Sequence, residues 1–230
     1  MRKTLFTASV LAVALAAPFA QAHQAGDIIV RAGAITVDPH ESTSSVKVDR
    51  GIPGGADLGG KASLDSDTQL GLNFAYMLTD KIGVELLAAT PFQHNVSISG
   101  TAGGIADGKL GDLKHLPPTL SVVYYPLNSK SAFKPYVGAG INYTWFFDES
   151  VGSAASAGGF DNFRVKNSWG WAAQIGMDYM LTESVMLNAQ VRYIDIDTEA
   201  YVDNTILGVR AKVDVDVDPF VYMVGLGYKF

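Results

Sequence analysis

Four histidines, at positions 23, 40, 94 and 115, are the side chains in this sequence best suited to acid–base or metal chemistry. His94 and His115 end neighbouring predicted strands, so they could lie close together as an acid–base pair or hold a metal ion. The alternative, which we favour, is that both are solvated histidines at the base of a loop. No zinc-ligand spacing, nucleophile elbow or phosphate-binding loop accompanies them. The sequence therefore predicts no catalytic residue, no metal site and no cofactor.

A second group of polar residues alternates with apolar side chains along predicted strands. Its members on the inward face near the short-turn ends are Arg31, Glu85, Asp178 and Lys229, with Arg192 further up. Inside a narrow barrel such charges must pair or remain hydrated. We expect a structural network that closes the periplasmic half, because an eight-stranded barrel is barely wider inside than its side chains. The other interpretation is a selectivity filter in an open pore.

The elements that would position these charges are strands with one apolar face, and the clearest is residues 218–230. Every second residue from Phe220 to Phe230 is apolar or aromatic, whereas the opposite face carries two glycines and Lys229. This pattern is typical of a strand whose apolar face meets lipid. The terminal Phe230 resembles the closing-strand signature of bacterial outer-membrane barrels. We therefore expect the C-terminal strand to engage the barrel-assembly machinery.

Seven further segments alternate in the same way. The eight predicted strands are residues 27–37, 68–78, 82–96, 117–126, 134–147, 165–180, 185–197 and 218–230. Short connections alternate with long ones rich in Gly, Ser, Ala and Asp, which we expect to be mobile surface loops with low-complexity tips at 51–60 and 154–159. The rhythm predicts an all-β fold: an eight-stranded antiparallel transmembrane β-barrel with long extracellular loops and short periplasmic turns. A soluble lipocalin-type barrel would instead have polar outer faces and an apolar interior.

Residues 1–22 have the features of a secretory signal: a basic start, an apolar core at 5–17 and Ala20-Gln21-Ala22 before the cleavage point. We expect residues 23–230 to form a single outer-membrane domain. The net charge of −6 becomes more negative once the signal leaves, which argues against a nucleic-acid partner. The chain has no cysteine, so disulfides are excluded. After the signal no apolar run reaches the roughly 18 residues of a membrane helix.

Several stretches resemble the OmpW family of small outer-membrane proteins, in its pseudomonad, OprG-like branch. The matching segments are 23–33, 82–92 (IGVELLAATPF), 115–120 (HLPPTL), 133–147, 167–179 and 193–198. The resemblance implies a barrel whose narrow interior carries small, largely apolar molecules, with small amino acids as a cargo of this branch. It also implies a gap in the wall through which cargo leaves sideways. The family's constriction maps onto Leu87 and onto Arg192, which stands at a tryptophan position, so a purely hydrophobic gate is not expected.

Pro117 and Pro118 adjoin at the start of the fourth predicted strand, and neither can donate a ladder hydrogen bond. One interpretation is two prolines tolerated at a strand end. The other is a local break in strand pairing, which would have to be lined by water or cargo because unpaired backbone groups in lipid are costly. The resemblance implies a lateral opening at these two residues, and both interpretations stay open.

Three functions remain open. The first, which we favour, is a channel for passive uptake of small apolar or amphipathic molecules, set in outer-membrane lipid. The second is a structural or host-contact barrel that acts through its long loops. The third is an outer-membrane enzyme with Ser, His and Asp on scattered strands. Glycines on the predicted inner faces leave unfilled volume and favour the channel: Gly33, Gly71, Gly138, Gly140, Gly170, Gly176, Gly225 and Gly227.

Overall fold

The computed structural model describes residues 23–104, 106–127 and 131–230, so the expected signal at 1–22 lies outside the described residues. Two short helices are present, η1 (Ala102–Gly104) and α1 (Ser153–Ala157), and neither these nor any other described segment is a helix long and apolar enough to cross a membrane. The strands are β1 (Ile28–Asp38), β2 (Ser42–Thr43), β3 (Val46–Arg50), β4 (Ala56–Leu64), β5 (Asp67–Met77), β6 (Ile82–Ala89), β7 (Phe92–Thr101), β8 (Gly108–Leu116), β9 (Thr119–Tyr124), β10 (Phe133–Val151), β11 (Phe160–Val165), β12 (Ser168–Met180), β13 (Val185–Ile194), β14 (Asp197–Asn204), β15 (Val209–Asp216) and β16 (Phe220–Lys229).

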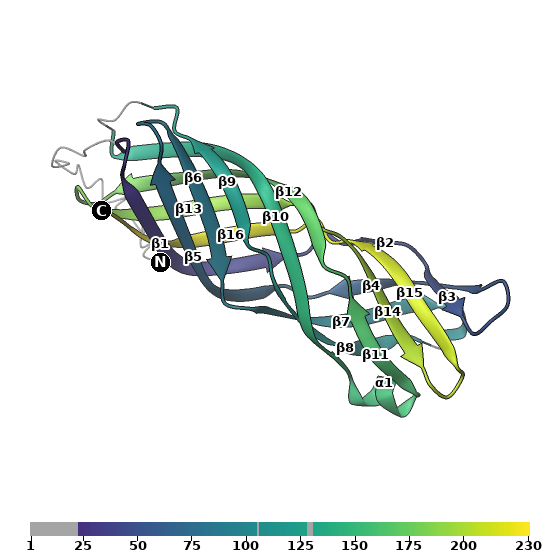
Figure 1. Cartoon of the computed structure of the whole chain (residues 1–230). Helices are drawn as coiled ribbons and strands as arrows, with labels where there is room; N and C mark the ends of the chain where they lie inside the picture. The colour runs from purple at the N-terminus through teal and green to yellow at the C-terminus, as the bar shows by residue number, and fades with distance from the viewer. Residues whose placement is uncertain (1–22, 105, 128–130) are drawn as a thin grey trace, which may run out of the picture.

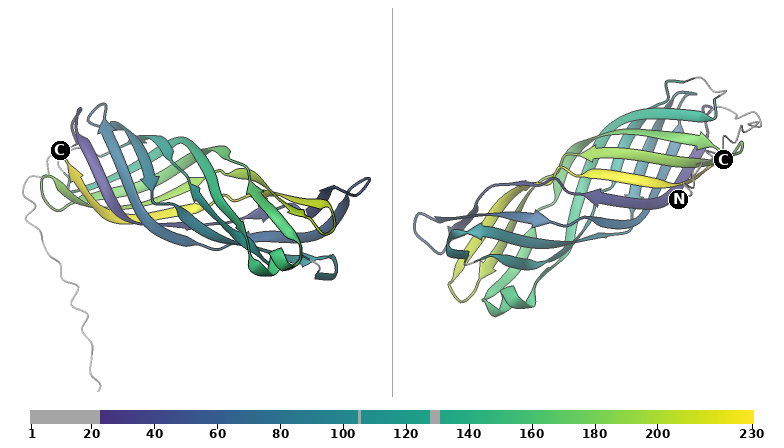
Figure 2. Two further views of the ribbon diagram at one scale, coloured as in Figure 1. Left: turned by 60° about the horizontal axis from the view of Figure 1, so that its bottom comes forward. Right: turned by 180° about the vertical axis from the view of Figure 1, so that it is seen from behind.

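Eight of these strands close into an antiparallel barrel, in the order β10-β12-β13-β16-β1-β5-β6-β9 and back to β10. The first and last strands of the chain pair in register, with Ala32 opposite Leu226, so this part of the sheet has no free edge. Both ends of the described chain lie at the same end of the barrel, as do the turns between β5 and β6 and between β12 and β13 (Figures 1 and 2). The predicted fold class is confirmed.

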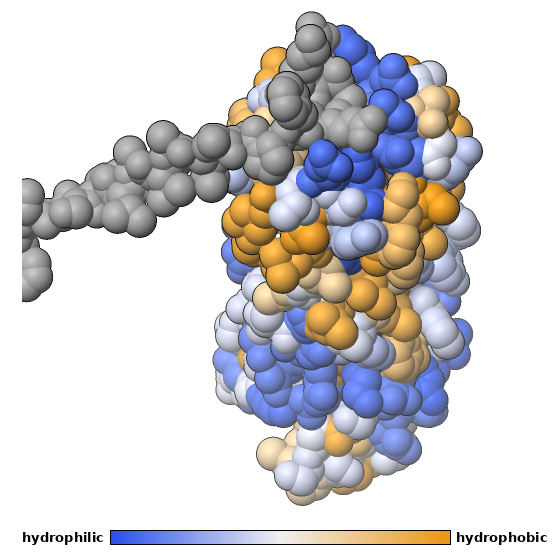
Figure 3. All heavy atoms as spheres, turned by 90° about the vertical axis from the view of Figure 1, so that its left-hand side faces the viewer, coloured by the Kyte–Doolittle hydropathy of each residue, from blue (hydrophilic) through white to orange (hydrophobic). Residues whose placement is uncertain are grey.

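The barrel's outer surface is apolar because alternate residues of each strand point outward. Figure 3 shows hydrophobic residues gathered across the middle of the visible face, with hydrophilic ones above and below. Large exposed apolar side chains on the eight strands include Leu70, Phe74, Leu86, Val122, Ile141, Trp169, Trp171, Ile175, Val224 and Leu226. This is the arrangement that lipid requires and the reverse of a soluble barrel.

The long connections are not mobile loops, and the expectation that they would be was wrong. Strands β3, β4, β7, β8, β11, β14 and β15, with the end of β10, continue the sheet beyond the membrane barrel as an extracellular extension (Figure 1). Strand β15 shows why: Ala211, Val213 and Val215 are buried while the residues between them are charged. The extension therefore has an apolar inside and a polar outside. A sequence pattern in which the apolar residues face outward does not identify strands whose apolar residues face inward.

The third predicted strand, 82–96, is two strands with a break at Thr90 and Pro91. The break shifts the alternation, because one extra residue moves a side chain to the other face of a sheet. Unbroken alternation over 82–96 predicts Phe92 on the outer face and Gln93 on the inner face. Phe92 is instead buried and inward, and Gln93 is exposed.

Candidate functional site

The periplasmic half of the barrel interior is built around one ion pair between β1 and β12. Arg31 donates from Nε to Asp178 Oδ1 at 2.9 Å and from Nη2 to Asp178 Oδ2 at 2.6 Å. Both side chains are fully buried. Asn188 Nδ2 adds a third donor to the carboxylate at 2.9 Å, and Tyr125 Oη accepts from Arg31 Nη2 at 2.7 Å. A bidentate, fully satisfied pair of this kind tolerates burial in the low-dielectric interior.

A second tier lies on the side of the ion pair that faces the extension, and Glu85 links the two. Glu85 Oε2 accepts from Arg31 Nη1 at 3.3 Å, while its Oε1 accepts from Arg192 Nη2 at 2.7 Å and from Gln174 Nε2 at 2.8 Å. Arg192 also donates from Nε to Gln174 Oε1 at 2.6 Å. Within this network two arginines, Arg31 and Arg192, therefore face two carboxylates, Asp178 and Glu85.

The structure thus brings four of the five predicted inward charges into one hydrogen-bonded network, Arg192 included. The fifth, Lys229, has its Nζ 3.8 Å from Asp27 Oδ2, close to the chain ends. The neutral members were not foreseen individually: Asn73, Tyr125, Tyr136, Gln174 and Asn188. Their only sequence signal is a polar residue at an inward position, which does not identify its partner.

The barrel wall is interrupted between β6–β7 on one side and β8–β9 on the other. The β6–β9 ladder ends at the pair Leu87 and Thr119, and the β7–β8 ladder begins at Phe92 and His115. No ladder pair joins residues 88–91 to residues 116–118 within the described chain. Backbone pairing is therefore missing at this point of the wall.

Three prolines occupy the interruption: Pro91, Pro117 and Pro118. None has an N–H to donate, so the ladder cannot close across them. Pro91 was not singled out from the sequence, although a proline inside an alternating run is a signal for a strand end.

The other flank of Pro117 and Pro118 is bonded to β10. Tyr143 donates its N–H to Pro118 O at 3.1 Å, and the buried Asn142 Nδ2 donates to Pro117 O at 3.0 Å and to Pro118 O at 3.1 Å. On the far side, Thr90 N–H donates to Leu70 O of β5 at 2.9 Å. The gap therefore lies only between the two proline segments.

On the side of the network that faces the extension, the interior of the protein becomes apolar. The extension encloses a pocket of about 490 Å³ lined mostly by apolar residues, among them Val48, Ile98, Leu110, Val202 and Leu207. A smaller apolar void of about 40 Å³ lies deeper, beside Leu113 and Phe146. Two separate apolar cavities thus lie inside the extension, the smaller one beside Leu113 and Phe146.

His94 and His115 lie together at the base of the extension, so the expectation that they would be close is confirmed and the solvated interpretation is wrong. Their Nε2 atoms are 2.8 Å apart, and the rings stack with centroids 4.8 Å apart. His94 Nδ1 donates to Asp65 O at 2.5 Å, which leaves His94 Nε2 to accept from His115. Burial lowers the pKa of His115 to about 3, with the neighbouring His94 adding to the effect. The pair is therefore neutral at pH 7.

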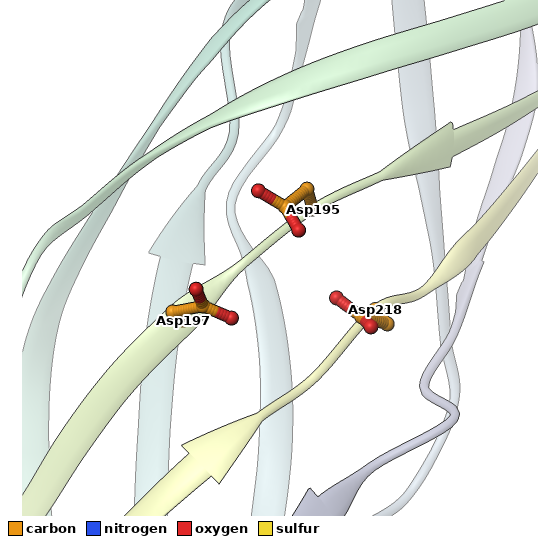
Figure 4. A group of neighbouring side chains, drawn as sticks. All are labelled: Asp195, Asp197 and Asp218. Atoms are coloured by element: carbon orange, nitrogen blue, oxygen red, sulfur yellow. The ribbon is translucent and has the colours of Figure 1, made fainter.

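One cluster of carboxylates also gathers on the chain. Asp195, Asp197 and Asp218 lie where β13 passes into β14 and where β15 passes into β16, with their side chains towards one another (Figure 4). Three ligand oxygens lie within 4.8 Å of one another. These residues are partly or largely exposed, and exposed acidic groups are common without a metal ion.

The geometry described above agrees with the comparisons with known proteins. The OmpW family model matches residues 24–230. The chain belongs to the OmpW family. Outer membrane protein W of Vibrio cholerae serotype O1 is 45% identical over 231 residues, covering 100% of both chains. The crystal structure of outer membrane protein OprG from Pseudomonas aeruginosa is 54% identical with a TM-score of 0.85, covering 91% of this chain and 98% of that one. Outer membrane protein AlkL of Ectopseudomonas oleovorans is 33% identical over 186 residues, covering 79% of this chain and 74% of the relative.

As a member of the OmpW family, the protein is an outer-membrane β-barrel. Leu87, expected at the constriction, is 3% exposed and belongs to the apolar core that continues into the extension. Arg192, the other expected constriction residue, is tied to Glu85 and Gln174. Leu87 sits two residues beyond Glu85 on β6, on the same inward face, so the two expected constriction residues occupy neighbouring levels.

Proposed function

We propose that this protein is a channel for passive uptake of small apolar or amphipathic molecules, including small amino acids, with sideways release through the barrel wall. The observation that carries the proposal is the position of the wall interruption. It lies between an apolar interior above and a bonded ionic network below.

The network supports sideways release because it obstructs a straight path. Arg31, Asp178 and Glu85 are fully buried, and Arg192 is 1% exposed. An apolar solute would have to displace buried ion pairs to reach the periplasmic end, which leaves charges uncompensated.

The interruption supports release into lipid because the two faces beside it match an apolar solute. Inside, Leu87 of β6 and Phe92 of β7 are buried apolar residues at one side of the gap. Outside, Leu86 and Leu120 are exposed on the lipid face of β6 and β9. A small apolar molecule therefore moves between two apolar environments without crossing the polar tier.

Proline replacement tests the proposal. The double variant Pro117→Thr/Pro118→Val restores two N–H donors, so it should close the ladder and lower uptake of the small apolar dye N-phenyl-1-naphthylamine, which fluoresces once it enters lipid. Whole cells with matched amounts of folded barrel, checked by heat-modifiable migration, give the comparison. Pro53→Val in the exposed β3–β4 turn is the control.

Unchanged uptake by a correctly folded double variant would count against sideways release. If the Glu85→Gln/Asp178→Asn variant instead altered flux strongly, a straight-through pore would be the better account. If neither change altered flux, a barrel that acts through its extracellular extension would remain.

A further inference from the structure

Several hydrogen-bonding groups inside the barrel have no partner among the described residues, Asn73 Nδ2 and Asn188 Oδ1 among them. Two others lie nearest to Glu85: Arg192 Nη1 on β13 and Ser121 Oγ on β9. The exposed fraction is 1% for Arg192 and 2% for Ser121. A buried polar atom without a hydrogen bond is costly, so both positions call for a ligand or an ordered water.

Both groups lie at the level of Glu85, in the second tier of the network. Ser121 is in register with Glu85 on one side and with Gly140 on the other, and Arg192 Nη2 donates to Glu85 Oε1 at 2.7 Å. Thr119, two residues from Ser121 on the same inward face, makes the last ladder pair before the wall interruption. The unpartnered groups therefore lie immediately below the proposed exit.

Gly140 allows β10 to approach β9 closely beside the Ser121 hydroxyl. A Cβ at this position would lie 2.6 Å from Ser121 Oγ. It would also lie 2.1 Å from Leu120 O, which leaves glycine as the residue that fits.

The available groups favour an anion. A guanidinium N–H and a hydroxyl O–H both donate, and donors on a cation bind a carboxylate strongly. The charge of Glu85 is already compensated by Arg31 and Arg192, and Gln174 donates a third hydrogen bond to it. Apolar inward side chains also lie near these groups, among them Leu87, Ala172 and Val221, beside the polar Thr119 and Gln174.

We propose that Arg192 Nη1 and Ser121 Oγ form a binding site for the carboxylate of a small amphipathic monocarboxylate, with its apolar body held beside Leu87. This inference rests on the proposed channel function and names a solute class for it. The bound carboxylate accepts from both donors, and the solute then leaves through the interruption directly above.

The test uses the full chain in lipid nanodiscs and three probes that share a ring and a two-carbon chain: phenylacetate, 2-phenylethanol and 2-phenylethylammonium. Binding is followed by NMR through the Ser121 amide and the Arg192 Nε–H signals, and through ligand signals for the variants. Phenylacetate should bind saturably and at least about tenfold more tightly than the alcohol or the ammonium ion, since a hydrogen bond to a charged group contributes roughly that factor.

Ser121→Ala should weaken phenylacetate binding about tenfold and leave the alcohol unchanged. Arg192→Gln should weaken it at least as much. Ser97→Ala in the extension is the matched control and should change neither. Because Arg192→Gln also removes an ion pair with Glu85, its folding is checked by heat-modifiable migration, and Ser121→Ala decides the matter if that variant fails to fold.

Equal binding of phenylacetate and 2-phenylethanol to the unaltered protein would overturn the carboxylate site, as would full phenylacetate affinity in Ser121→Ala. Either result leaves the channel proposal standing if N-phenyl-1-naphthylamine uptake still depends on the prolines. Loss of that dependence contradicts the channel proposal itself, so the two failures are distinguishable.

Discussion

Arg31 and Asp178 are 147 residues apart in the sequence and form a bidentate pair in the barrel interior, at 2.6 and 2.9 Å. Neither side chain is exposed. The pair joins β1 to β12 across the lumen and, through Glu85, holds Arg192 in the same network. It is the centre of the polar network on which the proposed sideways route rests.

Arg31→Met should destabilise the folded barrel by about 3–5 kcal/mol, because it leaves Asp178 buried without its counter-charge. The measurement is the urea midpoint of the folded form in detergent, followed by heat-modifiable migration. Arg164→Met is the control: its partner Glu149 is 3.8 Å away and its own side chain is half exposed, so the expected loss is about 0–1 kcal/mol. The double variant Arg31→Met/Asp178→Leu should recover most of the loss. Equal midpoints for Arg31→Met and Arg164→Met would contradict the role given to the pair.

The His94–His115 pair predicts a pH-dependent stability of the extension. The pKa of His115 is about 3 in the folded chain and close to 6.5 when unfolded, so the unfolded state binds more protons between these values. Stability is thus fully present above about pH 6.5 and falls as the pH drops towards 3, by about 1.4 kcal/mol per pH unit for one such histidine.

His115→Phe should remove that part of the pH dependence, because a phenylalanine fits beside Phe92 and Phe146 and does not titrate. The measurement is protease resistance of the extension between pH 7.5 and pH 4. His40→Phe, at an exposed position, is the control. An unchanged pH profile in His115→Phe would show that His115 is not the group responsible.

The position of the membrane predicts opposite outcomes for one substitution at two exposed leucines. Leu226→Arg on β16 should cost about 2–4 kcal/mol if it lies near the midplane, since its outward side chain meets lipid. Leu207→Arg, at the tip between β14 and β15 where the side chain is 71% exposed, should cost almost nothing. Folding yields into lipid vesicles give the comparison. Similar losses at both sites would contradict the assignment of lipid and water to these two surfaces.

The membrane barrel could be predicted because lipid imposes a strict pattern on it. Residues such as Leu226 and Val224 must be apolar and their neighbours small or polar, so alternation alone located all eight wall strands. The inward position of Arg31 follows from the same pattern. Its partners do not, because alternation gives the face of a residue and says nothing about which side chain lies across the lumen.

The extension and the wall interruption were harder to predict for different reasons. Strand β15 alternates with apolar residues inward, so a test for lipid-facing strands excludes it. The extra residue at Thr90 and Pro91 shifts the alternation without leaving a signal in the apolar pattern. A prediction from alternation alone therefore puts Phe92 on the wrong face. The proximity of His94 and His115 follows from their positions at the ends of neighbouring predicted strands. Their burial does not, because it depends on the extension, whose residues were expected to form loops.

The central claim, release through the wall, is tested most directly by a reversible clamp across the interruption. The chain has no cysteine, so Ala88→Cys/Pro118→Cys introduces the sole pair of thiols, at the position that follows the last ladder pair of Leu87 and Thr119. The thiols are joined by a short bis-thiosulfonate linker, and joining is verified by mass. Uptake of N-phenyl-1-naphthylamine is then measured in whole cells before joining, after joining and after reduction. Uptake should fall on joining and return on reduction to the level of the unjoined double variant, while Ala88→Cys alone, treated in the same way, should be unaffected. Full uptake with the clamp verified as closed would contradict the central claim.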